Sequence, residues 1–240
     1  MHAWLRWDAV SRLLPADALS LLEIGAGLGS FGAMLEQRFE YIGLEPDEQC
    51  QRVANDRTHG KVRLESVEHH DGTYDLVCAF EVLEHLDDDV AALRVWGAHT
   101  NRYLMVSVPL NPARFGPTDV HAGHFRRYTT ESLSHAFCEA GFTPTHVIAY
   151  GFPAGYALET VRNAIVSRRT TPQSMGARTA ASGRWLQPSR SIRHLTWTAA
   201  LPWRVAQRPF AESERGTGLV AIAERVSGLV DARDSRKLES

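Results

Sequence analysis

The sequence predicts an α/β fold built on a doubly wound, mostly parallel sheet of seven strands. Short apolar runs alternate along the chain with segments whose apolar residues recur at helical spacing, the pattern of successive strand–helix units. The first apolar run leads directly into a turn with glycine at every second position, within residues 21–29. The run over 74–80 is apolar enough to occupy the centre of a parallel sheet.

The expected elements follow from these periodicities and from local start and stop signals. In chain order they are helix 3–14, strand 21–24, helix 30–39, strand 41–44, a helix from 46, strand 62–64, strand 74–80, helix 88–97, strand 103–108, helix 130–140, strand 146–150 and strand 218–223. Pro15 ends the first helix, and Pro46 is tolerated in the first turn of another. Thr130 is expected to cap the helix that Gly141 ends.

Composition divides the chain into four parts. Residues 1–17 are expected to form an N-terminal helix, and 18–151 with 217–226 form the sheet core. Residues 151–210 contain nine arginines, no lysine and a single acid, so we interpret 152–216 as a mainly helical, Arg- and Trp-rich insertion before the last strand. Residues 227–240 read as a polar tail.

Bulk properties fit a globular enzyme. A chain of 240 residues can bury a full α/β core and still carry an insertion. The formal net charge of -2 gives no overall attraction to nucleic acid or membranes. Cys50, Cys78 and Cys138 lack the spacing of a disulfide framework or zinc site. No leader pattern or membrane-length apolar run occurs, so a cytoplasmic location is expected.

The glycine turn and the strand after it predict a nucleotide site. Glycines let a backbone approach a ligand closely, and Glu45, at the end of the second strand, is placed for a ribose diol. Glu23 would suit the ammonium group of an amino-acid moiety and would repel a pyrophosphate. Residues 27–32 also spell Gly-x-Gly-x-x-Gly, so a nicotinamide-dependent oxidoreductase remains an alternative.

Several segments in the expected order resemble class I S-adenosylmethionine (SAM) methyltransferases. Residues 23–29 resemble motif I, Glu-x-Gly-x-Gly-x-Gly. Residues 75–87 and 105–111 are similar to the fourth and fifth strands of the branch that includes the ubiquinone-biosynthesis O-methyltransferases, and 121–129 recurs in its bacterial members. The resemblance covers about 18–150 and the last strand, and implies a Rossmann-like sheet.

The resemblance implies SAM as cofactor. The glycines would shape the methionine-side loop, Glu45 would accept hydrogen bonds from the ribose hydroxyls, Glu65 would read the adenine and Phe80 would pack near the sulfonium. The full set of implied cofactor-binding residues is Glu23, Gly25, Ala26, Gly27, Gly29, Glu45, Pro46, Glu65, Ser66, Phe80 and Glu81.

The segment from Glu81 to His85 raises the question of a metal. If a helix begins there, Glu81, Glu84 and His85 share one face, and carboxylates with imidazole suit Mg²⁺ or Mn²⁺. The segment is similar to that of small-RNA 3′-terminal 2′-O-methyltransferases, in which such a triplet and a later histidine hold a metal; His124 would be that histidine here. In many relatives without metal the same residues cap a helix or face the acceptor, so both interpretations stay open.

The loop after the fifth strand supplies candidate catalytic bases. His121 and His124 lie on the carboxyl edge of the sheet, where a histidine can accept a hydroxyl proton near neutral pH. We therefore expect SAM-dependent O-methylation of a small-molecule or sugar-type acceptor. The arginine-rich insertion would form its lid, which favours an acceptor with an acidic group or a lipid-linked acceptor at a membrane surface.

Other functions remain as alternatives to that expectation. Metal-dependent 2′-O-methylation of RNA is one, although the insertion contains no recognisable RNA-binding module, so a nucleic-acid partner is not expected. A catalytically silent SAM-binding domain is another. The sequence does not indicate an oligomeric state.

Overall fold

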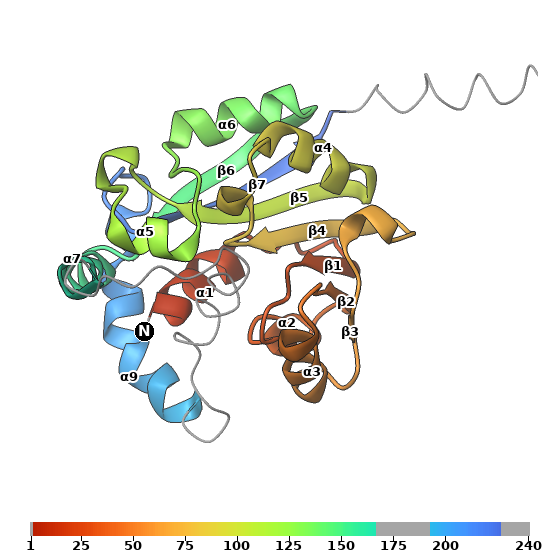
Figure 1. The fold of residues 1–240 in the computed structure, drawn as a ribbon, viewed down its shortest axis with the longest axis horizontal. Coiled ribbons are helices and arrows are strands. Elements are labelled where there is room, and N and C mark those ends of the chain that lie inside the picture. The colour runs from red at the N-terminus through yellow and green to blue at the C-terminus, as the bar shows by residue number, and fades with distance from the viewer. Residues whose placement is uncertain (1, 167–192, 227–240) are drawn as a thin grey trace, which may run out of the picture.

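The computed structural model describes residues 2–166 and 193–226. Their centre is a seven-stranded sheet in the order β3-β2-β1-β4-β5-β7-β6, with β7 antiparallel to both of its neighbours. Helices cover both faces of the sheet (Figure 1). The predicted doubly wound, mostly parallel α/β architecture is therefore confirmed.

All seven predicted strands are present. They are β1 (Ser20–Ile24), β2 (Glu40–Leu44), β3 (Val62–Arg63), β4 (Tyr74–Phe80), β5 (Thr100–Pro109), β6 (Phe142–Tyr150) and β7 (Gly218–Arg225). The β4 strand is the predicted central strand, because it pairs with β1 on one side and β5 on the other. Its side chains alternate between two cores, with Leu76 and Cys78 on one face and Val77 and Ala79 on the other.

The helices agree with the sequence except in two places. They are α1 (His2–Leu13), α2 (Gly32–Leu35), α3 (Glu48–Arg57), α4 (Asp89–Ala98), α5 (Pro117–Ala122), α6 (Thr130–Glu139), α7 (Ala154–Val166) and α9 (Arg193–Ala206). The α5 helix was not predicted. The α2 helix has one turn rather than the span 30–39, because the chain turns after Leu35 and brings Phe39 into the core. Thr129, not Thr130, caps α6 and accepts a bond from Ser132 N–H at 3.0 Å.

Each face of the sheet has its own hydrophobic core. Buried side chains of α4 and α6, including Trp96 and Phe137, pack on one face. Buried side chains of α1, α2 and α3, including Leu5, Leu35 and Ala54, pack on the other. Each fully buried large side chain contributes about 1.5–3 kcal/mol. These two layers fix the strand ends, from which the functional loops project.

The described part of the insertion is helical, and its second helix, α9, is attached to α1. Asp8 of α1 is 1% exposed, and its Oδ1 lies 2.8 Å from Arg208 Nη2 and 3.3 Å from Arg204 Nη2. The Gln207 amide donates to Asp8 Oδ2 at 3.2 Å. Residues 167–192 of the predicted insertion and the predicted tail 227–240 lie outside the described residues. Among the helices that are described, none is long and apolar enough to cross a membrane.

Replacing Asp8 with alanine is expected to destabilise the fold strongly. The change leaves two arginines without the carboxylate they share, and breaking a buried ion pair costs about 3–5 kcal/mol. Urea unfolding should show this loss in the free energy of unfolding. Glu48→Ala is the matched control, because it removes an exposed pair with Arg52 and should cost no more than roughly 0.5 kcal/mol. Equal losses in the two variants would contradict a clamp at Asp8.

Candidate functional site

The glycine turn after β1 leaves one backbone position open. Gly25, Gly27 and Gly29 have φ values of 70°, 56° and 71°, a region that side chains disfavour. A Cβ on Gly25 would lie 2.7 Å from Val82, and one on Gly29 would lie 2.7 Å from the Ala54 Cα. A Cβ on Gly27 would meet nothing within 4 Å. Packing therefore requires the outer two glycines, whereas the middle one borders open space.

Glu45 lies at the end of β2 against this turn. Its Oε2 accepts from Gly27 N–H at 2.7 Å, and its Oε1 accepts from Asp47 N–H at 3.0 Å. Burial raises the pKa of the Glu45 carboxyl, while the two backbone bonds oppose that rise. Each oxygen keeps acceptor capacity beyond its backbone bond. The turn is also tied to β2 by the Ala26 N–H, which donates to the Leu44 carbonyl at 2.9 Å, and Pro46 beyond it is exposed.

Glu23 is more deeply buried than a residue that contacts a ligand ammonium group needs to be. Its side chain is 2% exposed in β1, and the Tyr41 hydroxyl donates to its Oε2 at 2.6 Å. Burial raises the pKa of Glu23 to about 8, so the carboxyl is mostly protonated at neutral pH. In this structure Glu23 is part of a core hydrogen bond, and its attraction to a ligand ammonium stays a prediction.

The other implied cofactor residues lie along the same edge. Glu65 follows β3, and its Oε2 lies 3.2 Å from Nδ1 of the buried His70. Ser66 follows it at the start of a short 3₁₀ turn. Phe80 ends β4 and packs edge-to-face on Phe31, with ring centroids 5.1 Å apart.

Glu81 turns away from the segment that follows it. Its φ of 59° ends β4 in a left-handed turn, and the 3₁₀ helix η2 (Leu83–His85) begins after it. The helical register in which Glu81 would share a face with Glu84 and His85 is therefore not formed. The Glu81 carboxylate instead accepts from the Ser107 hydroxyl at 3.0 Å and the Tyr150 hydroxyl at 3.1 Å.

The groups that surround Glu81 were not predicted from the sequence. Arg6 of α1 lies 3.8 Å from Glu81 Oε1, and the His2 ring packs edge-to-face on Tyr150 at 5.7 Å. Burial opposes ionisation of Glu81, but Arg6 and His2 lower its pKa overall. Burial and Arg6 lower the pKa of His2 to about 4. Only the helical periodicity of 3–14 indicated α1, and periodicity does not show that Arg6 and His2 would lie near Glu81 and Tyr150.

Glu84, His85 and His124 converge. One ligand atom from each residue lies within 4.8 Å of the others, and the two imidazole rings are 4.7 Å apart. Glu84 is fully buried, 3.9 Å from His124 Nε2, and neither carboxylate oxygen has a hydrogen-bond partner among the described residues. Burial and the nearby Glu81 raise the pKa of Glu84. Burying such a carboxyl without a hydrogen-bond partner is costly, which makes Glu84 a candidate ligand for a cation.

Both histidines present the same nitrogen to the cluster. His124 Nδ1 lies 2.9 Å from Asp119 Oδ1, and His85 Nδ1 lies 3.3 Å from the Gly123 carbonyl oxygen. A carbonyl and an ionised carboxylate only accept, so each Nδ1 carries a proton, and when either ring is neutral its lone pair lies on Nε2. Burial, and then His124, lower the pKa of His85 to about 4, which keeps that ring neutral.

Asp119 connects the cluster with the insertion. Arg127 donates to both of its oxygens, at 2.9 and 2.8 Å. Arg127 in turn lies 2.6 Å from Glu159 of α7, which also pairs with Arg114 at 2.7 Å. Burial raises the pKa of Asp119, but His124 and Arg127 lower it overall to about 2. The only sequence signal for this contact was that Glu159 is the single acid of 151–210.

His121 is separated from these groups. It is exposed near the end of α5 and makes no hydrogen bond or ion pair within the described parts of the chain. The structure therefore brings His124 into a cluster of buried polar groups and leaves the other predicted base at the surface.

The cluster fits a divalent cation. Two Nε2 lone pairs and an orphaned carboxylate form a donor set in which each histidine is held through its other nitrogen, as metal-bound histidines usually are. Two imidazoles and one carboxylate suit Mn²⁺ better than Mg²⁺, which prefers oxygen ligands. Glu81, predicted as a fourth ligand, is not in the group that converges here.

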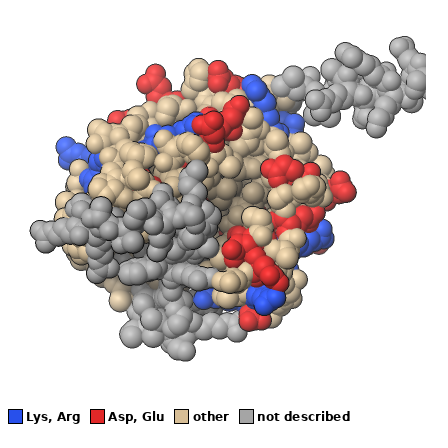
Figure 2. Space-filling view, viewed as in Figure 1, with Lys and Arg blue, Asp and Glu red and all other residues tan. Residues whose placement is uncertain are grey.

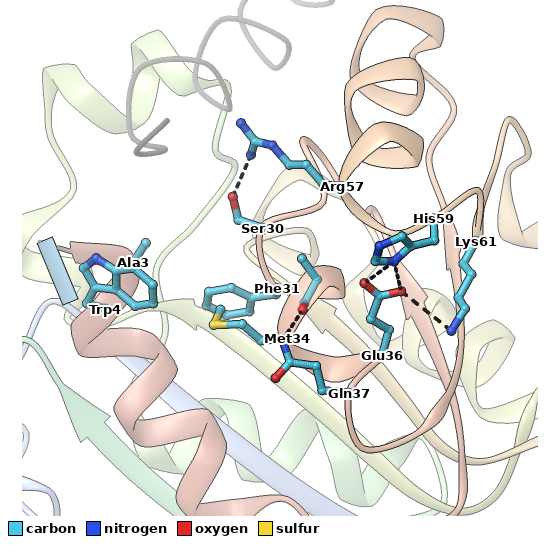
Figure 3. A pocket seen from close by; sticks show the side chains of 11 residues that line it. Ala3, Trp4, Ser30, Phe31, Met34, Glu36, Gln37, Arg57, His59 and Lys61 are labelled. Atoms are coloured by element: carbon cyan, nitrogen blue, oxygen red, sulfur yellow. Dashed lines mark hydrogen bonds and ion pairs between the residues drawn. The ribbon is translucent and has the colours of Figure 1, made fainter. Parts of the chain in front are cut away.

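A separate pocket of about 480 Å³ flanks the glycine turn between α1 and α2 (Figure 3). Trp4 lies opposite Phe31 and Met34, while Glu36, His59 and Lys61 form the polar side. None of the residues predicted to bind the cofactor lines this pocket. Ser30, which follows Gly29, is the lining residue that adjoins the glycine turn.

Comparisons with known proteins agree with this geometry. A family model described as "Methyltransferase domain" matches residues 3–147, more than half of the chain. No curated protein sequence matches significantly.

Solved structures share the fold at low identity. A SAM-dependent methyltransferase of Thermotoga maritima, titled a possible histamine N-methyltransferase, is 18% identical with a TM-score of 0.59, covering 94% of this chain and 89% of that one. The N-methyltransferase NodS of Bradyrhizobium japonicum, in complex with S-adenosylhomocysteine, is 14% identical with a TM-score of 0.53. The match covers 93% of this chain and 85% of NodS. The methyltransferase domain of the bacterial protein CtHen1-CN is 14% identical with a TM-score of 0.53. The match covers 93% of this chain and 98% of that domain.

Burial of Glu23 predicts a pH-dependent stability. A carboxyl with a folded-state pKa of about 8, above its unfolded value of 4.5, stabilises the fold fully only below the unfolded pKa. Stability is then lost as pH rises from about 4.5 through about 8, by at most roughly 5 kcal/mol. Urea unfolding of Glu23→Gln across this range should be much less dependent on pH.

The Tyr41 hydroxyl provides the control for this prediction. It lowers the pKa of Glu23, so Tyr41→Phe should steepen the loss of stability with pH rather than remove it. Parallel pH profiles for the wild type and Glu23→Gln would show that Glu23 is not the group responsible.

Proposed function

The chain belongs to the methyltransferase-domain family and is a SAM-dependent methyltransferase, and we propose that it methylates an oxygen atom of a small-molecule or sugar-type acceptor carrying an acidic group. The observation that supports oxygen as the target is the orientation of His124. Asp119 holds its Nδ1, and its Nε2 lies 3.9 Å from the buried Glu84 carboxyl group. A hydroxyl must lose its proton during methyl transfer, and this arrangement provides an acceptor for it.

Methyl transfer from a sulfonium is an in-line displacement of an already activated group. The protein must mainly hold the acceptor oxygen behind the methyl and remove its proton. His124 Nε2 would take that proton, and the Asp119 carboxylate would stabilise the imidazolium that forms. Arg127 would keep Asp119 in place through their ion pair, and Glu159 would in turn hold Arg127.

The cofactor would lie over the glycine turn. The open space at Gly27 allows close backbone approach, and Glu45 faces that space with acceptor capacity for the two ribose hydroxyls. Glu65 and Ser66 would border the adenine, and Phe80 and Glu81 the sulfonium end, as the resemblance to class I methyltransferases implies. These roles rest on the position of each residue at the carboxyl edge of the sheet.

A bound divalent cation is the alternative to a general base at His124. Glu84, His85 and His124 would hold it, and it would lower the pKa of the acceptor hydroxyl and fix the oxygen in line. His124 cannot be ligand and base at once, so the metal-assisted and general-base mechanisms are alternatives. The orphaned oxygens of Glu84 favour the metal, because they have no other partner among the described residues.

The same cluster favours a second candidate function, metal-dependent 2′-O-methylation of RNA. A nucleic-acid substrate would need a basic surface. Figure 2 shows acidic and basic side chains interspersed over the visible face, and the whole chain has a net charge of -2. We therefore rank the small acidic acceptor first.

Product analysis tests the proposed function directly. Protein with methyl-labelled SAM should be offered hydroxy acids, sugar acids and sugar phosphates, with aliphatic amines and a short RNA as competing classes. Label should appear in the hydroxyl acceptors that carry an acid. Transfer to amines alone, or to the RNA 3′ end alone, would overturn the proposed acceptor class.

Removing the Glu45 carboxylate is expected to weaken SAM binding. Glu45→Ala should raise the Kd by at least about 10- to 100-fold, because the loss of even one hydrogen bond to a charged group costs about 1.5–3 kcal/mol. Isothermal titration measures the effect. Glu48→Ala, an exposed acid three residues further on, is the matched control and should bind SAM normally. Normal affinity in Glu45→Ala would remove β2 from the cofactor site.

Chelation separates the two mechanisms. With a metal in use, EDTA should abolish turnover and Mn²⁺ should restore it better than Mg²⁺, while Glu84→Gln should lose Mn²⁺ binding measured by electron paramagnetic resonance. His121→Ala is the control, since that histidine is exposed and apart from the cluster. Activity that survives EDTA but not His124→Ala would instead establish His124 as a base acting alone.

A further inference from the structure

A buried histidine lies behind Glu65 and takes no part in the proposed reaction. The His70 side chain is 0% exposed, and its Nδ1 lies 3.2 Å from Glu65 Oε2. Its Nε2 lies 2.9 Å from the hydroxyl oxygen of Tyr74, the first residue of β4. Both ring nitrogens therefore have a polar partner, and the ring connects the loop after β3 with the start of the central strand.

The surroundings of His70 hold its ring in one orientation. The His70 backbone N–H donates to the Val67 carbonyl at 3.2 Å, which fixes the main chain. The ring stacks on Tyr74, with centroids 5.8 Å apart and planes inclined by 23°, and the His99 ring lies at the same centroid distance. The imidazole therefore has little freedom to turn away from Glu65.

The hydrogen bonds of this group are directed toward Glu65. A carboxylate only accepts, so His70 Nδ1 carries a proton in its contact with Glu65 Oε2. Burial raises the pKa of the Tyr74 hydroxyl, so that hydroxyl keeps its proton and can donate to Nε2 when the ring is neutral. Tyr74 thus favours the tautomer of His70 that donates to Glu65.

One oxygen of Glu65 is left for a ligand. Its Oε2 accepts from His70, whereas its Oε1 has no hydrogen-bond partner among the residues that the structure describes. The Glu65 side chain is 24% exposed, so a ligand can reach it. Glu65 is therefore held through one oxygen and offers the other as an acceptor.

The strand order places Glu65 where an adenine would lie. The β3 strand is the neighbour of β2, and Glu45 N–H donates to the Arg63 carbonyl at 3.0 Å, so the ends of these two strands lie side by side. In the proposed site the sulfonium lies at the end of β4 and the ribose at Glu45. A cofactor extended along this edge continues to the end of β3, which Glu65 follows.

We propose that His70 is a positioning residue through which Glu65 selects a 6-aminopurine. His70 holds Glu65 Oε2, and Oε1 then accepts a hydrogen bond from the amino group of the adenine. A 6-oxopurine has an acceptor oxygen at that position, which cannot donate to the carboxylate and is repelled by it. The inference rests on the adenine placement in the proposed function and not on the acceptor, so the two can fail separately.

Two ligands that differ in one group of the purine test this selection. S-inosylhomocysteine has a 6-oxo group where S-adenosylhomocysteine has the 6-amino group. Isothermal titration of the full chain should give wild type a Kd about 10- to 100-fold higher for the inosyl compound. The readout is the ratio of the two Kd values, because incomplete folding of a variant lowers both affinities alike and leaves their ratio unchanged.

Substitutions at His70 separate positioning from packing. His70→Leu fills much of the same volume without a donor, so the ratio should fall below about threefold. His70→Asn keeps an amide donor near the position of Nδ1 and should restore most of the ratio. Tyr74→Phe should lower the ratio less than His70→Leu does, because it loosens the ring and leaves the donor in place.

Glu65→Gln should reverse the preference. When His70 donates to the amide oxygen of the new side chain, the amide N–H₂ faces the base and can donate to a 6-oxo group. His135→Leu is the matched control, because His135 makes an exposed contact with Glu139 on α6, with 3.8 Å between Nδ1 and Oε2. This variant should give the wild-type ratio.

Four results would overturn the proposal. They are equal affinity of wild type for the two compounds, a wild-type ratio in His70→Leu, equal losses in His70→Leu and His70→Asn, and a preference for the adenosyl compound in Glu65→Gln. The third would assign the effect of His70 to packing rather than to its donor. None of them bears on the acceptor class, and a failure to find an acidic hydroxyl acceptor would leave the ratio and its dependence on His70 intact.

Discussion

The ion pair between Asp119 and Arg127 is the interaction on which the candidate site depends. Both side chains are almost fully buried, and the Asp119 carboxylate also accepts from His124 Nδ1 and from Gly116 N–H at 2.9 Å. Removing one partner of a buried pair costs about 3–5 kcal/mol, because the other charge stays uncompensated. The same pair orients the histidine and, through Glu159, attaches α7. A local change in the insertion therefore acts directly on the site.

The parallel sheet explains why distant segments meet there. The β1, β2 and β4 strands are adjacent and parallel, so the glycine turn, Glu45 and the turn at Glu81 all emerge at one edge. The strand order leaves Glu45 against Gly27 on one side of β1 and the Glu84 cluster beyond β4 on the other. The proposed cofactor and acceptor sites thus lie at neighbouring strand ends.

The sequence predicted the elements that depend on local residue patterns. Every strand was found, because a buried strand is a run of apolar residues, and the contact of Glu45 with the glycine turn follows from strand adjacency. The left-handed turn at Glu81 could not be predicted, since a glutamate seldom adopts it and its support comes from Ser107. The burial of Glu23 and the pairing of Arg127 with Glu159 depend on contacts between residues distant in sequence, which one chain's periodicity does not contain.

Burial of Glu84 carries a free-energy cost that a bound ligand would offset. A fully buried carboxylate with no hydrogen-bond partner in the described structure destabilises the fold by itself, as an unsatisfied buried polar group does. A ligand that supplies the missing partner binds the folded chain and not the unfolded one, so it recovers that free energy on binding. The surrounding charges are already paired, which leaves Glu84 and the two Nε2 atoms as the groups that gain most from a ligand. Glu84 thus lies, without a hydrogen-bond partner in the described structure, next to the histidine that the Asp119 network holds in place.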